Sequence, residues 1–93
     1  MQNFLEYKVE NNNILSSIDK SIKKARQIEA GKYPYAVIIS SKYADKFKLD
    51  NLTYLPKDGF KSIPIIKHPA VSPNALKLVY NEESLIQILE NIH

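Results

Sequence analysis

The sequence contains no cysteine, only two glycines and no long apolar run. Without cysteine the chain can form neither disulfides nor thiolate metal sites, and it has no cysteine nucleophile, which fits a cytosolic protein. Two glycines cannot supply a glycine-rich loop that cradles phosphate. No apolar run approaches the roughly 18 residues of a membrane span, and residues 1–13 lack the form of a signal peptide. We therefore expect a cytoplasmic chain without membrane contact.

Histidine is equally scarce. His68 stands between Lys67 and Pro69, and His93 ends the chain. Two histidines without cysteine do not match a zinc motif, and no carboxylate near His68 in the sequence would orient it as a general base. No serine lies in a G-x-S-x-G motif. We expect no catalytic, cofactor-binding or metal-binding residues, because an enzyme would need a pocket that joins His68 to an acidic side chain.

The totals describe one small globular domain, residues 1–93. The sequence is 44% hydrophobic and 25% charged, which is typical of a soluble protein with one modest core. Its net charge is +3, and Arg26 is the only arginine among thirteen basic residues. Lysine is a point charge and lacks the planar fork of arginine, so this bias suits loose contact with polyanions better than sequence-specific readout.

The first half of the chain shows two strong apolar patterns. A helix is expected over residues 14–30, with Gly31 at its C-terminal end. Its apolar stripe consists of Ile14, Leu15, Ile18, Ile22, Ala25 and Ile28. Pro34 then introduces residues 35–39, a continuous apolar run that is typical of a strand covered on both faces.

Two weaker patterns flank these segments. Residues 4–9 alternate and predict a short edge strand, with Leu5, Tyr7 and Val9 on one face. Ser40 or Ser41 is expected to cap a short helix that runs to about Lys48. Its inward side chains would be Tyr43, Ala44 and Phe47.

The second half begins with a loop over residues 49–62, in which Leu52, Tyr54 and Leu55 are expected to tuck against the core. Residues 63–66 predict a strand, and Pro64 argues for an edge or strand-start position because it donates no ladder hydrogen bond. The remaining segments are a rigid connector over 68–74, a strand over 75–80 with Leu76, Leu78 and Tyr80 on one face, and a helix capped by Asn81 with the stripe Leu85, Ile88, Leu89 and Ile92.

The resulting order is β-α-β-α-β-β-α. It predicts an α/β (α+β) fold, a two-layer sandwich in which two or three helices pack on a small mixed sheet.

Lysines and aromatic residues are interleaved, and single-strand binders combine such residues for phosphate contact and base stacking. The sequence places Tyr35, Tyr43 and Phe47 in the core, which leaves Tyr7, Tyr33, Tyr54 and Phe60 as candidates for exposure. Tyrosine is also enriched at protein interfaces, so self-association is an equally direct interpretation. Nucleic-acid binding is the alternative function at this point.

Three segments carry a resemblance to a known family. They are residues 33–40 (YPYAVIIS), residues 63–66 (IPII) and residues 75–80 (ALKLVY). In this order, and after a preceding helix, they resemble the A-domain of encapsulins, which are protein-shell relatives of tailed-phage major capsid proteins. The similarity covers roughly residues 14–88. These are packing motifs and they name no site residue.

The resemblance implies a capsid-type A-domain fold and a cytoplasmic structural protein that self-associates or docks onto a partner enzyme, without catalysis. A shell protomer also has a long N-terminal helix, an extended loop and a peripheral domain, for which this sequence has no room. The chain therefore looks like a free-standing A-domain, as in the truncated encapsulins of hyperthermophilic archaea. Loops of this domain cluster at symmetry axes in the shell family. Expected contact segments are accordingly residues 57–60 in the 50–62 loop, the strand carrying Pro64, and residues 5–9.

Overall fold

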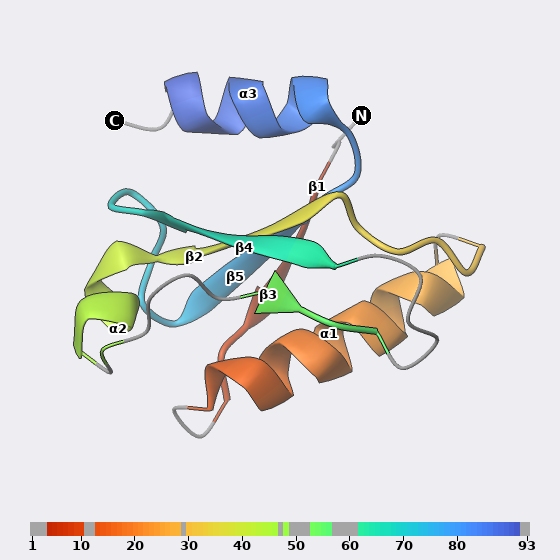
Figure 1. Ribbon diagram of the computed structural model, residues 1–93, viewed down its shortest axis with the longest axis horizontal. Coiled ribbons are helices and arrows are strands. Elements are labelled where there is room, and N and C mark those ends of the chain that lie inside the picture. The colour runs from red at the N-terminus through yellow and green to blue at the C-terminus, as the bar shows by residue number, and fades with distance from the viewer. Residues whose placement is uncertain are drawn as a thin grey trace.

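The computed structural model describes residues 4–10, 13–28, 30–46, 48, 53–56 and 62–91 (Figure 1). The elements run β1 (Phe4–Lys8), α1 (Ile14–Ile28), β2 (Ala36–Ser40), α2 (Ser41–Lys46), β3 (Thr53–Tyr54), β4 (Ile63–His68), β5 (Ala75–Val79) and α3 (Glu82–Asn91).

The five strands form one mixed sheet in the order β1-β5-β2-β4-β3. β2 lies in the middle, antiparallel to β5 and parallel to β4. β1 pairs antiparallel with β5 at one edge, and β3 pairs antiparallel with β4 at the other. The expected α/β class, a small mixed sheet packed by helices, is confirmed.

Helices cover both faces of the sheet, with α1 on one side and α3 on the other (Figure 1). Each helix has its own apolar cluster against the sheet, and the α1 side, which includes Tyr43 and Ala44 of α2, is the larger. The arrangement therefore has three layers, one more than the two expected. The fully buried pattern of β2 explains the third layer, because a strand that is apolar on both faces needs cover on both.

Alternation within β2 divides its side chains between these two clusters. Val37 and Ile39 face α1, whereas Ala36 and Ile38 face the α3 side. All five residues of β2 are buried. The expectation that residues 37–39 lie sandwiched within a mixed sheet is thus confirmed.

The buried face of α1 is shifted around the helix relative to the stripe that the sequence predicted. Ile14, Ile18, Ile22 and Ala25 are buried as expected, but Leu15 is 51% and Ile28 is 69% exposed. Ser17 and Ser21 complete the buried stripe instead. Leu15 lies about 160° around the helix from Ser17, so a face that buries Ser17 leaves Leu15 outside it.

Pro64 does not lie on an edge strand. β4 has β2 on one side and β3 on the other, and Pro64, its second residue, faces Thr53. The strand-start part of the expectation holds, because pairing with β2 begins only at Ile65. β4 also extends to His68, which was expected in the connector. Register pairing with Ser40 explains the extra length.

Capping side chains lie where the sequence placed them. Ser40 Oγ accepts the backbone N–H of Lys42 at 3.1 Å and begins α2. Asn81 Oδ1 accepts that of Ser84 at 2.7 Å and begins α3. The expectation that Tyr35 lies in the core is wrong, because its side chain is 43% exposed. The buried strand β2 begins one residue later, at Ala36.

Candidate interaction site

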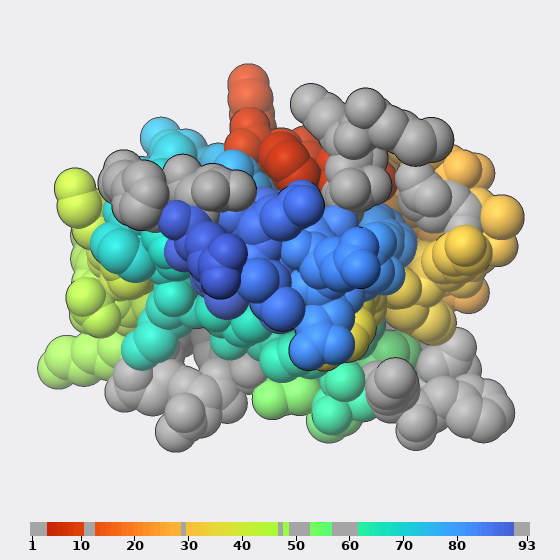
Figure 2. Space-filling model, turned by 90° about the horizontal axis from the view of Figure 1, so that it is seen from above, coloured from red at the N-terminus to blue at the C-terminus, as the bar shows by residue number. Residues whose placement is uncertain are grey.

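β1 is the longer of the two outer strands of the sheet, with five residues against two in β3. It pairs with β5 along one side only, from Phe4 opposite Val79 to Lys8 opposite Ala75. The expectation of an edge strand over residues 4–9 is confirmed. In Figure 2 its atoms (red) reach the surface at one margin of the molecule, beside α3 and not beneath it.

The hydrogen-bond pattern of β1 can be assigned from one contact. Val9 donates its N–H to the Asn74 carbonyl at 2.8 Å, on the same register as the rest of the pair. Because hydrogen-bonded positions alternate in an antiparallel pair, Leu5, Tyr7 and Val9 bond toward β5. The N–H and C=O groups of Phe4, Glu6 and Lys8 then point away from the sheet. Among the described residues nothing pairs with these outward groups.

Side chains of β1 also alternate between the two faces. Leu5, Tyr7 and Val9 are half-buried against the α1 cluster, and Phe4 packs against the α3 cluster. Glu6 and Lys8 share the face of Phe4 and are exposed. Their charges are opposite and stand two residues apart, so they form a short row of alternating sign along the open edge.

Lys77 of β5 lies opposite Glu6 and places a positive charge near its carboxylate. The Lys77 ammonium is 3.9 Å from the Glu6 carboxylate and 4.9 Å from the centre of the Phe4 ring. It is partly buried, whereas Glu6 remains more than half exposed. The carboxylate of Glu6 can therefore meet a second cation from outside.

Two open grooves flank the edge of β1. One, of about 270 Å³, lies between β1 and α1. The other, of about 630 Å³, lies between β1 and the segment that leads into β5. Glu6, Tyr7 and Lys8 line both grooves. A strand added along β1 would have alternate side chains available for each groove.

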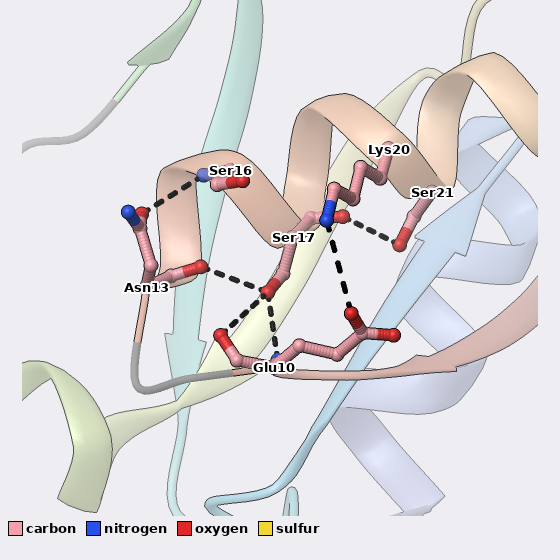
Figure 3. Close-up of polar contacts among 6 residues, drawn as sticks. All are labelled: Glu10, Asn13, Ser16, Ser17, Lys20 and Ser21. Carbon is pink, nitrogen blue, oxygen red and sulfur yellow. Dashed lines mark hydrogen bonds and ion pairs between the residues drawn. The ribbon is translucent and has the colours of Figure 1, made fainter.

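Ser17 of α1 closes the C-terminal end of this edge (Figure 3). Its hydroxyl accepts the backbone N–H of Glu10 at 2.8 Å and donates to the Asn13 carbonyl at 2.8 Å. Ser21 Oγ donates in turn to the Ser17 carbonyl at 2.6 Å. Glu10 is the next outward position after Lys8, and this network occupies its N–H. The open part of the edge therefore ends at Lys8.

The opposite edge of the sheet is short and anchored. Tyr54 of β3 donates its hydroxyl hydrogen to Asp19 of α1 at 2.8 Å. Burial, followed by this hydrogen bond and the negative charge of Asp19, raises the pKa of Tyr54 from 10.0 to about 12. Of the other expected contact segments, the strand of Pro64 is interior, and residues 57–60 lie outside the described residues.

Tyr7, Tyr33 and Tyr54 are the candidate nucleic-acid residues that the structure describes, and all three are half-buried. Tyr33 and Tyr54 pack against the main core, as Tyr7 does. The Tyr33 hydroxyl accepts a hydrogen bond from Arg26 at 2.9 Å, and the guanidinium stacks 4.1 Å from the ring centre. Phe60 and Phe47 lie outside the described residues.

The histidines are not brought to an acidic partner in the part of the chain that the structure describes. His68 ends β4, and its Nδ1 accepts the Ala70 N–H at 3.2 Å. His93 lies outside that part. Within it, no three histidine, aspartate or glutamate side chains group closely enough to hold a metal ion. None of its helices is both long and apolar enough to cross a membrane.

A comparison of the chain with protein-family models, curated proteins and solved structures finds no match in any of the three.

Proposed function

We propose that this chain is a non-enzymatic interaction protein that associates with itself or docks onto a partner protein through the open edge of β1. The observation that carries the proposal is the set of outward N–H and C=O groups at Glu6 and Lys8, flanked by two grooves. An exposed strand edge is a ready template for pairing with another chain. Main-chain hydrogen bonds supply the affinity in such pairing, and adjacent grooves receive alternate side chains.

The kinship with encapsulin A-domains belongs to this proposal. Its support is the sequence resemblance and the position of the three similar segments, which fall on β2, β4 and β5. These strands are neighbours in the sheet order β5-β2-β4. On this view the chain is a structural protein of the cytoplasm, and the contact surface is β1 and not a shell-forming loop.

The test replaces Glu6 by proline. The Glu6 N–H points away from the ladder, so Glu6→Pro removes an outward donor without breaking a bond to β5. The molar mass of the full chain is measured by light scattering over a range of concentrations, and circular dichroism verifies the fold. We expect the wild-type chain to associate and Glu6→Pro to stay monomeric. If the wild-type chain is monomeric at every concentration, self-association is ruled out. If Glu6→Pro associates as the wild type does, the β1 edge is ruled out as the contact surface.

A matched control is Lys42→Ala, an exposed substitution on α2 away from the edge. It should associate as the wild type does. The alternative function, nucleic-acid binding, is tested by measuring binding to labelled single-stranded DNA at two salt concentrations. Phosphate-driven binding weakens steeply as salt rises.

A further inference from the structure

We propose that the partner of the β1 edge is a second copy of this chain, with the two β1 strands antiparallel and Tyr7 directly opposite the partner's Tyr7. This inference rests on the proposed function, since it specifies which strand docks and in what register. The resulting assembly is a dimer whose two five-stranded sheets join into one continuous sheet.

Charge decides the register. Two antiparallel copies of β1 related by a two-fold axis can be centred on Leu5, Glu6, Tyr7 or Lys8. Centring on Leu5 sets Glu6 opposite the partner's Phe4, so no opposite charge lies directly across from its carboxylate. Centring on Glu6 or on Lys8 sets two like charges directly opposite each other, which is destabilising. Centring on Tyr7 sets Glu6 opposite the partner's Lys8, and Lys8 opposite the partner's Glu6. An in-register parallel pairing would again oppose like charges.

The backbone agrees with the Tyr7 register. Phe4, Glu6 and Lys8 are the outward positions of β1. In this register Phe4 lies opposite the partner's Glu10, and Glu6 and Lys8 each meet an outward residue of the partner. Both pairs are then of the hydrogen-bonded type, in which the two residues exchange two N–H···O=C bonds. Glu10 takes no part in this exchange, because its N–H is already donated to Ser17. The pairing thus stops where the open edge stops.

Side chains on both faces fit the same arrangement. On the α3 side, Lys77, Glu6 and the partner's Lys8 form a row of alternating charge across three strands, which extends the existing Lys77–Glu6 contact of 3.9 Å. On the α1 side, the partner's Tyr7 faces the groove between β1 and α1. Hydroxyl and ammonium groups line that groove, among them Ser21, Lys20 and Lys24, and can meet its phenol.

The register can be tested with single cysteines, because the chain contains none of its own. In a non-hydrogen-bonded antiparallel pair the Cα atoms are about 4.5 Å apart, within the roughly 4.4–6.8 Å that a disulfide spans. Tyr7→Cys should therefore form a covalent dimer with itself on mild oxidation. Glu6→Cys should not, since the two copies of position 6 are offset by two residues along the strand and lie about 8 Å apart.

A mixture avoids any change at the half-buried Tyr7. Glu6→Cys and Lys8→Cys both alter exposed side chains, and these positions are opposite each other only in the Tyr7 register. The two variants should cross-link when mixed, at least about tenfold more than either variant alone or than the exposed control Lys42→Cys. All samples are read on non-reducing gels at equal concentration.

The outcomes separate this inference from the proposed function. Cross-linking of the Glu6→Cys and Lys8→Cys mixture, with self-cross-linking of folded Tyr7→Cys, supports the register. Self-cross-linking of Glu6→Cys, or a mixture no better than the Lys42→Cys control, overturns it. If Glu6→Pro still abolishes association in that case, the edge remains the contact surface and only the register is wrong. If Glu6→Pro has no effect, both are wrong.

Discussion

The backbone N–H of Glu10 donates to the hydroxyl of Ser17 at 2.8 Å and joins the end of β1 to α1. Ser17 is only 3% exposed, and its hydroxyl also donates to the Asn13 carbonyl. One side chain therefore forms hydrogen bonds with a backbone group at the end of the strand and with another at the start of the helix. It also sets where the open edge of β1 stops.

Replacing Ser17 by alanine should destabilise the chain. The substitution leaves the partly buried Glu10 N–H without its acceptor, which costs about 1–3 kcal/mol. Ser16→Ala is the matched control, since Ser16 is an exposed neighbour in the same helix and the change in helix propensity is similar. Urea denaturation of both variants measures the free energy of unfolding. Equal stability of the two would show that the Ser17 contact contributes nothing.

The Tyr54–Asp19 hydrogen bond predicts a pH dependence at the alkaline end. The folded-state pKa of Tyr54 is raised to about 12, above its usual 10.0. The contribution to stability is therefore complete below about pH 10 and is lost as pH rises toward 12. Denaturation of the wild type and of Tyr54→Phe should show a stability difference that narrows over this interval. Lysines titrate there in both chains, so the difference between them is the quantity to follow. A constant difference would contradict the raised pKa.

Ser84 of α3 is buried at 2% exposure, and its Oγ has no hydrogen-bond partner among the described residues. Burying an unpaired hydroxyl is unfavourable, so Ser84→Ala should hold or raise stability. Ser21→Ala is the comparison, because Ser21 is similarly buried but donates a hydrogen bond at 2.6 Å. In thermal and urea unfolding, the free energy of unfolding of Ser84→Ala should exceed that of Ser21→Ala by about 1 kcal/mol. A clear loss of stability in Ser84→Ala would reveal a partner for this hydroxyl.

Two substitutions at the C-terminal end of α1 should change the free energy of unfolding in opposite directions. Gly31 has φ +80° and donates its N–H to the Arg26 carbonyl at 2.7 Å, while Ala30 before it has φ +52°. A side chain at Gly31 would meet no atom within 4 Å, so Gly31→Ala carries only the backbone cost of about 1 kcal/mol. Ala30→Gly relieves the same kind of strain and should stabilise by up to about 1 kcal/mol. Changes of equal sign in urea unfolding would contradict this account.

Local chemistry made much of the fold predictable. The Asn81 cap, the stripe from Ile14 to Ala25 and the apolar run of β2 each encode their element within a few residues. β3 was not predictable, because Thr53 and Tyr54 show no alternation and become a strand only by pairing with Pro64 and Ile63 of β4. The position of His68 in β4 likewise depends on a distant partner, Ser40.

The candidate site was predictable only in part. Alternation of Leu5, Tyr7 and Val9 identified the strand, and its edge position was expected. The outward direction of the Glu6 and Lys8 backbone depends on which side β5 occupies, and the Lys77–Glu6 contact depends on register. The periodicity of the sequence predicts neither the direction of this backbone nor the Lys77–Glu6 contact. The opposite signs of residues 6 and 8 were visible and become informative once the open edge is known.

The most direct measurement for the β1 edge is a charge-swap experiment followed by sedimentation. In a dimer of Glu6→Lys, two ammonium groups face each other at each of the paired positions 6 and 8, and in a dimer of Lys8→Glu two carboxylates do. Like charges directly opposite are destabilising, so each variant alone should sediment as a monomer. Mixed in equal amounts, the two variants restore opposite charges at both pairs and should form a heterodimer. Dimers of Lys8→Glu alone, or a mixture that stays monomeric while the wild type dimerises, would contradict the pairing of two β1 strands about Tyr7.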